Sequence, residues 1–120
     1  MNIDEILKRI SMSKFRNSFH LNKKMKKYVQ EKGYDTIRSH AYDFINTRIR
    51  PEVINNDGKQ TPMRQVHPVF IAQHACACCC RKCLEKWYHI KNNKELTNEE
   101  VDFIVNLLIA WIKKEMGNIN

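Results

Sequence analysis

The chain has 120 residues, of which 42% are hydrophobic and 28% are charged, and its formal net charge at pH 7 is +8. These values exclude a disordered chain and predict a single globular domain that covers residues 1–120. No apolar run approaches the roughly 20 residues that span a bilayer, and the first 12 residues mix isoleucine and leucine with charges, unlike a signal peptide, so we expect a cytoplasmic protein without membrane contact.

Most of the positive charge lies in the first half of the chain. Residues 1–50 hold 12 Lys or Arg and 5 Asp or Glu, whereas residues 51–120 hold 9 and 8. A basic segment of this kind favours a polyanion such as nucleic acid, although a lysine-rich surface that serves only solubility is the plain alternative. The candidate nucleic-acid-binding residues are Lys23, Lys24, Lys27, Arg38, Lys59 and Arg64.

Three helices are expected before the first proline of the chain. Apolar residues at helical spacing predict them over residues 4–10, 23–32 and about 36–48. Asn22 is a suitable N-cap for the second helix, and Gly33 is a suitable end. Asp35 or Thr36 is expected to cap the third helix, which has to stop before Pro51.

Residues 51–66 form a long segment without helical or strand periodicity. The sequence Asn56-Asp57-Gly58 predicts a turn within it. The adjoining Gly58-Lys59-Gln60-Thr61 resembles the end of a phosphate-binding loop, but the upstream glycine and the preceding strand are missing, which excludes a P-loop. A loop of this length in a compact domain is often functional.

The stretch from His67 to His89 is the centre of the predicted fold. All five cysteines of the chain lie in it, at positions 76, 78, 79, 80 and 83. Pro68 suits a first helical turn, and no glycine or further proline follows within the stretch. We therefore predict one continuous buried helix over residues 68–88. Its thiol-bearing face would present Cys76, Cys79, Cys80 and Cys83.

The last helix is expected to begin after a capping box formed by Thr97 and Glu100. It runs from residue 98 to about residue 116, where Gly117 ends it. Because no stretch alternates like a strand, the predicted fold class is all-α. The expected architecture is a single compact domain of about five helices around the central Cys-rich helix.

The cysteine spacing predicts a metal site. Cys80 and Cys83 have the C-x-x-C spacing of a zinc or redox pair, and zinc takes four sulfur or imidazole ligands. The candidate ligands are Cys79, Cys80, Cys83, His40 and His74, with His20 as a further histidine. An iron–sulfur cluster is less favoured, because four ligands on one straight helix would distort it. Alternatively, the cysteines are small hydrophobic residues that only pack in a core.

Three functions remain open on this basis. The leading hypothesis is a small metal-binding module, with zinc as the metal, whose basic N-terminal half contacts nucleic acid. The second is a cysteine-dependent enzyme in which Arg81 and Lys82 lower the pKa of the thiol at Cys79 or Cys80 and a histidine serves as base. The third is an interaction protein without a metal.

Six motifs spread over residues 14–112 also carry a resemblance. They are Phe19-His-Leu21, Ile37-x-x-His40-Ala41, Asp57-Gly-Lys-Gln-Thr-Pro-Met63, His67-Pro-Val-Phe70, Ala72-Gln-His-Ala75 and Cys79-Cys-x-x-Cys83-Leu-x-Lys-Trp87. Together they resemble a small bacterial and phage family that is known only as a domain of unknown function. The resemblance therefore implies no activity.

The positions at which this chain departs from that family's pattern reduce the number of cysteines that are candidates for a functional role. Members of the family have glycine where this chain has Val66, and small or hydroxylated residues where it has Cys76 and Cys78. They have histidine directly after the tryptophan, where this chain has Tyr88 and then His89. The resemblance implies that the other three cysteines, at positions 79, 80 and 83, are the functional ones.

Overall fold

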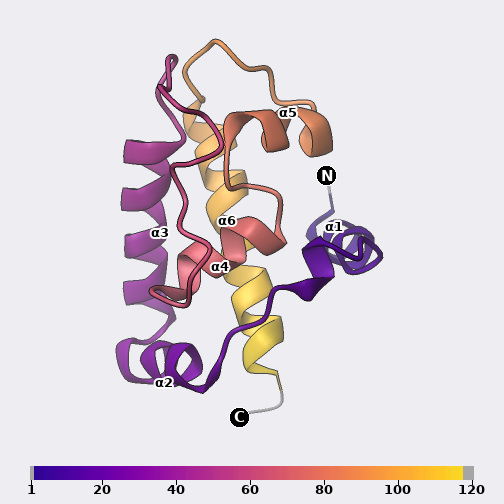
Figure 1. Ribbon diagram of the computed structural model, residues 1–120. Helices are drawn as coiled ribbons and strands as arrows, with labels where there is room; N and C mark the ends of the chain where they lie inside the picture. The colour runs from indigo at the N-terminus through magenta and orange to yellow at the C-terminus, as the bar shows by residue number, and fades with distance from the viewer. Residues whose placement is uncertain (1, 118–120) are drawn as a thin grey trace.

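The computed structural model describes residues 2–117, which form helices and the segments that connect them (Figure 1). The elements are α1 (Ile3–Ser11), the short 3-10 helix η1 (Arg16–Ser18), α2 (Lys23–Lys32), α3 (Tyr34–Arg48), α4 (Pro68–Ala75), α5 (Arg81–Tyr88) and α6 (Asn98–Met116). No strand occurs in residues 2–117, so the predicted all-α class is confirmed, with six α-helices where about five were expected.

Helix α6 is the longest helix in residues 2–117, and three other helices pack against it. In Figure 1 it runs behind α4, with α3 on one side and α1 on the other, and all three helices contact it. Nine of its 19 residues are buried, which follows from its nearly continuous apolar sequence. Burying each large aliphatic side chain contributes about 1.5–3 kcal/mol. Within the described part of the chain, no helix has the length and apolar character needed to cross a membrane.

The predicted continuous helix over residues 68–88 is wrong, because the structure has two helices there. Helix α4 ends at Ala75, and α5 begins at Arg81. Between them the backbone of Ala77 is left-handed, with φ of 57°, a conformation that costs an L-residue roughly 1–2 kcal/mol. The amide N–H of Cys78 donates to the Gln73 carbonyl at 2.8 Å, and the Gln73 side chain donates to the Cys78 carbonyl at 3.1 Å.

The physical cause of the break lies in local competition for the backbone. Cysteine is a weak helix former, and four of the five residues from 76 to 80 are cysteines. Cys80 has extended backbone angles, and its sulfur accepts a hydrogen bond from the Cys83 N–H at 3.4 Å, as an N-cap does. Asp57 accepts hydrogen bonds from the next two N–H groups, those of Arg81 and Lys82. These contacts begin a new helix at Arg81.

The start of the third helix also differs from the prediction. Gly33, and not Asp35 or Thr36, is the N-cap of α3, and it is simultaneously the C-cap of α2. Its N–H donates to the Val29 carbonyl, and its own carbonyl accepts from the Ile37 N–H. Gly33 has φ of 82°, which glycine adopts readily, so one residue can join the two helices.

The long loop before α4 is irregular, as predicted, and it packs against the break between α4 and α5. Arg81 fixes its start, because the buried guanidinium donates to the carbonyls of Ile49 and Pro51, and also to that of Lys91 after α5. Further along, the Thr61 hydroxyl donates to the Cys79 carbonyl at 2.9 Å. The loop therefore holds the cysteine-rich segment in place.

Helix α6 has the predicted ends, and its N-terminus offers a stability test. The Thr97 hydroxyl accepts from the Glu100 N–H at 3.1 Å, and the Glu100 carboxylate accepts from the Thr97 N–H at 2.8 Å. Thr97→Ala should lower the free energy of unfolding by about 1 kcal/mol, whereas Thr97→Ser, which keeps the hydroxyl, should change it little. Urea denaturation followed by circular dichroism measures the difference, and equal losses in both variants would contradict the capping role.

Candidate metal centre

Three of the five thiols gather at the start of α5. The Sγ atoms of Cys79, Cys80 and Cys83 all lie within 4.8 Å of one another. The Cys80 sulfur is 3.1 Å from that of Cys83, and the Cys79 sulfur is 3.6 Å from it. Cys79 and Cys80 expose only 8% and 5% of their surface, and Cys83 is partly exposed. The site thus lies just beneath the molecular surface.

The local fold explains why these three sulfurs meet. Cys80 is the N-cap of α5 and Cys83 lies in its first turn, so the N-cap geometry turns one sulfur back toward the other. Cys79 directly precedes the cap, and its thiol donates to the Cys83 sulfur at 3.6 Å. Cys76 and Cys78 do not belong to the group: both are fully buried, and the Cys78 thiol donates to the Cys76 carbonyl.

The guanidinium of Arg16, from η1, completes the surroundings of the sulfurs. It donates to the Cys83 sulfur at 3.3 Å and to the Cys79 sulfur at 3.6 Å. The same side chain donates to the carbonyl of His74 in α4 at 2.7 Å. Arg16 is largely buried, with 9% of its surface exposed. A positive charge is therefore held against the thiols by a segment more than 60 residues away in sequence.

Hydrogen bonds within the cluster concentrate negative charge on one sulfur. The thiols of Cys79 and Cys80 and the Arg16 guanidinium all donate to Cys83, and these contacts lower the pKa of Cys83 despite its burial. The pKa of Cys79 is raised, because its thiol is a donor to its neighbours and because it is buried. The pKa of Cys80 is raised as well. The cluster therefore favours a thiolate at Cys83 and protonated thiols at Cys79 and Cys80.

The predicted role of Arg81 and Lys82 in lowering a thiol pKa is not supported. The Arg81 guanidinium points to three backbone carbonyls, and Lys82 is exposed. Arg16 is the cation that contacts the sulfurs, and in the sequence it contributes only to the positive charge of the N-terminal half. In the sequence, Arg16 lies between the aromatic residues Phe15 and Phe19, and this position does not by itself indicate that the arginine is buried.

The two candidate histidines are not among the donor atoms of this group. The Nε2 atom of His74 lies 3.0 Å from the Thr61 carbonyl, and its ring stacks on Phe19 with centroids 5.4 Å apart. Burial lowers the pKa of His74. This histidine therefore ties the long loop and the segment after η1 to α4, next to the carbonyl that Arg16 contacts.

His40 takes part in a separate cluster. Its Nδ1 atom lies 3.0 Å from Nε2 of His67, whose own Nδ1 accepts from the Val69 N–H and caps α4. Burial, and then the electrostatic effect of His40, lower the pKa of His67 to about 4, so His67 is neutral at physiological pH. His20, the further candidate, contacts Glu115 of α6. The three candidate histidines, His20, His40 and His74, therefore occupy three different places in the fold.

The six candidate nucleic-acid-binding residues are dispersed. Lys23, Lys24 and Lys27 are exposed on α2, and Lys27 pairs with Glu31 at 3.8 Å. Arg38 of α3 donates to Asn106 of α6 at 2.6 Å. Lys59 and Arg64 are exposed in the long loop, at positions separated by the buried Thr61.

Comparison with known proteins gives a family without a known activity. The model of the domain of unknown function DUF4186 matches residues 4–113, and the chain therefore belongs to that family. The resemblance found in the sequence motifs is confirmed at the level of a family of unknown function. No solved structure matches the chain. Any function has to be argued from the site itself.

Proposed function

We propose that this protein is a small metal-binding module in which Cys79, Cys80 and Cys83 hold one zinc ion. The observation that supports it is the gathering of the three sulfurs, two of whose separations are 3.1 and 3.6 Å. Tetrahedral zinc with Zn–S distances of about 2.3 Å requires sulfurs about 3.8 Å apart. The sulfurs are therefore close to the positions that an ion between them needs.

The donor set favours zinc over other metals. Three sulfur ligands exclude magnesium and calcium, which take oxygen ligands. A cubane iron–sulfur cluster takes four cysteines, and Cys76 and Cys78 are buried away from the group. Three protein ligands are also the number found in zinc sites that keep one position for water or an external ligand.

Arg16 has a defined role in this proposal. Three thiolates around a divalent zinc ion carry a net charge of −1, which is costly beneath the surface of a protein unless it is paired. The Arg16 guanidinium already lies 3.3 and 3.6 Å from two of the sulfurs, so it can offset that charge and orient the ligands.

Metal content is the direct test of the proposal. Protein purified without chelator should contain close to one equivalent of zinc, measured by elemental analysis. The metal-free protein should bind cobalt(II), a spectroscopic substitute for zinc, with the thiolate-to-metal charge-transfer absorption of a sulfur-rich site. Metal-free protein that binds neither ion at micromolar concentrations would refute the proposal.

The pKa shifts predict how zinc binding depends on pH. The lowered pKa of Cys83 favours its thiolate, whereas Cys79 and Cys80, whose pKa values are raised, must each lose a proton to the solvent when they bind zinc. Zinc affinity should therefore rise with pH, by about two logarithmic units per pH unit near neutrality. Calorimetric titrations in buffers with different protonation enthalpies measure the released protons. A pH-independent affinity would contradict this assignment of charge.

A cysteine-dependent reaction is the second candidate, because Cys83 is a partly exposed sulfur with a lowered pKa. The two functions differ in the state of that sulfur. In the zinc-bound protein, Cys83 is coordinated and should react slowly with iodoacetamide; the enzyme hypothesis requires fast, stoichiometric alkylation of Cys83 in the protein as purified. Peptide mapping by mass spectrometry identifies the modified residue.

A further inference from the structure

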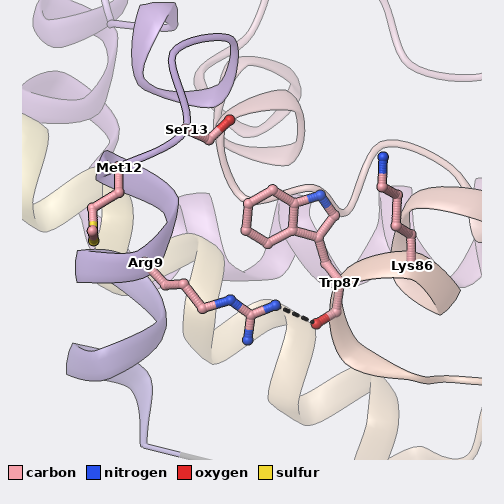
Figure 2. Close-up of a pocket in the computed structure, with 5 residues that line it drawn as sticks. All are labelled: Arg9, Met12, Ser13, Lys86 and Trp87. Carbon is pink, nitrogen blue, oxygen red and sulfur yellow. Dashed lines mark hydrogen bonds between the residues drawn. The ribbon is translucent and has the colours of Figure 1, made fainter.

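We propose that the groove between α1 and α5 binds single-stranded nucleic acid, with a base stacked on Trp87 and phosphates held by Arg9 and Lys86. The groove has a volume of about 380 Å³ and is lined by Arg9, Met12, Ser13, Lys86 and Trp87 (Figure 2). This inference is independent of the metal site, because none of the five lining residues is a proposed ligand.

The groove is built around a partly exposed tryptophan. Figure 2 shows the Trp87 indole between the Arg9 side chain from α1 and the Lys86 side chain from α5. The Arg9 guanidinium lies 5.2 Å from the centroid of the indole and donates to the Trp87 carbonyl at 3.1 Å. This hydrogen bond links α1 to α5 across the groove. Met12 adds apolar surface, with 78% of its area exposed.

The chemistry of the lining selects a ligand with planar rings and negative charges. Two of the five side chains are cations and none is a carboxylate. An aromatic platform beside cations is the arrangement with which proteins bind single-stranded DNA or RNA, because every base can stack on it and the backbone phosphates pair with the cations. Duplex nucleic acid hides its bases in the stack and cannot use the indole in this way.

The basic groove on α2 is a weaker candidate for the same ligand. It is lined by Lys24, Met25, Lys27, Tyr28, Glu31 and Val66. It also has an aromatic residue and two lysines, but Glu31 lies in it and pairs with Lys27 at 3.8 Å. The Glu31 carboxylate repels phosphate, and its ion pair with Lys27 leaves, within residues 2–117, only Lys24 unpaired among the two lysines of this groove. The proposed site therefore combines Arg9, from the basic first half of the chain, with Lys86 and Trp87 of α5. Neither cation is among the six candidates that the charge distribution of the sequence suggested.

Fluorescence anisotropy of a fluorescein-labelled oligothymidylate at low salt tests the proposal. The full chain should bind it, and Trp87→Ala should weaken binding by roughly 5- to 100-fold, the usual effect of losing one stacked base. Trp87→Phe keeps an aromatic ring and should retain most of the affinity. Lys86→Ala should weaken binding and make the dependence on salt concentration less steep, because one phosphate contact is lost.

Matched controls keep the result interpretable. The double variant Lys24→Ala/Lys27→Ala removes two exposed lysines from α2 and should bind almost as the unaltered chain does. Oligothymidylate should quench tryptophan fluorescence in the unaltered chain, and Trp87→Phe should lose that quenching while remaining folded by circular dichroism. The proposal is overturned if the chain does not bind at low salt, if a duplex binds more tightly than the single strand, or if Trp87→Ala binds as well as the unaltered chain.

Discussion

Replacing Cys83 by serine is expected to abolish zinc binding at micromolar metal while leaving the fold intact. Cys83 contacts both other sulfurs and Arg16, so no arrangement of the remaining two thiols restores the site. Removing a residue that only hydrogen-bonds to a metal ligand lowers metal affinity by about 10–100-fold. Removing a sulfur ligand itself should therefore lower the affinity for zinc by at least about 100-fold. Competition with a chromophoric chelator measures the affinity.

The same variant should lose the stabilisation that zinc gives. At a free zinc concentration of 100 times the dissociation constant, binding stabilises the native state by about 2.7 kcal/mol. For a domain of this size that corresponds to a rise in Tm on the order of 10 °C, which calorimetric scans with and without zinc detect. Cys83→Ser should show no zinc-dependent rise.

Cys78→Ala is the matched control for this experiment. It removes a thiol from the same segment, but one that is fully buried and outside the sulfur group. It should retain one equivalent of zinc and the zinc-dependent rise in Tm, with a modest loss of stability from the small cavity. If both variants lose zinc, or if both keep it, the assignment of the three ligands is wrong.

Arg81→Met is expected to destabilise the protein by about 3 kcal/mol or more. The Arg81 guanidinium, with 1% of the residue exposed, donates to the carbonyls of Ile49, Pro51 and Lys91. Each buried acceptor that loses its donor costs about 1–3 kcal/mol, and methionine, which has similar bulk, supplies no N–H group. Guanidinium chloride denaturation, followed by tryptophan fluorescence, measures the change in the free energy of unfolding.

The neighbouring residue provides the control. Lys82 is exposed, and only its backbone N–H contacts Asp57, so Lys82→Ala should change the free energy of unfolding by less than about 0.5 kcal/mol. A comparable loss in both variants would indicate that α5 itself is sensitive to substitution. A loss below about 1 kcal/mol for Arg81→Met would show that the three carbonyls find water instead.

Local sequence patterns predicted most of the helix ends. Asn22, Gly33, Thr97 and Gly117 act within a few residues of their own position, through side-chain caps or permissive backbone angles. The break between α4 and α5 was missed, although its signals are present: consecutive weak helix formers, and a cysteine three residues before another at a possible N-cap. Apolar periodicity alone does not reveal the break at residues 76–80, because all five of these residues are apolar and buried.

For the candidate site, the C-x-x-C spacing by itself indicated that the sulfurs of Cys80 and Cys83 meet, because these residues are the N-cap and part of the first turn of a helix, and the structure adds Cys79 to them. Only the tertiary structure decided what surrounds them. Arg16, 67 residues before Cys83, occupies the place for which a histidine was expected, while His40 and His74 are bound to His67 and Thr61. The reason is physical: short-range spacing is fixed by the geometry of the backbone, whereas a distant partner is selected by the packing of η1 and α4.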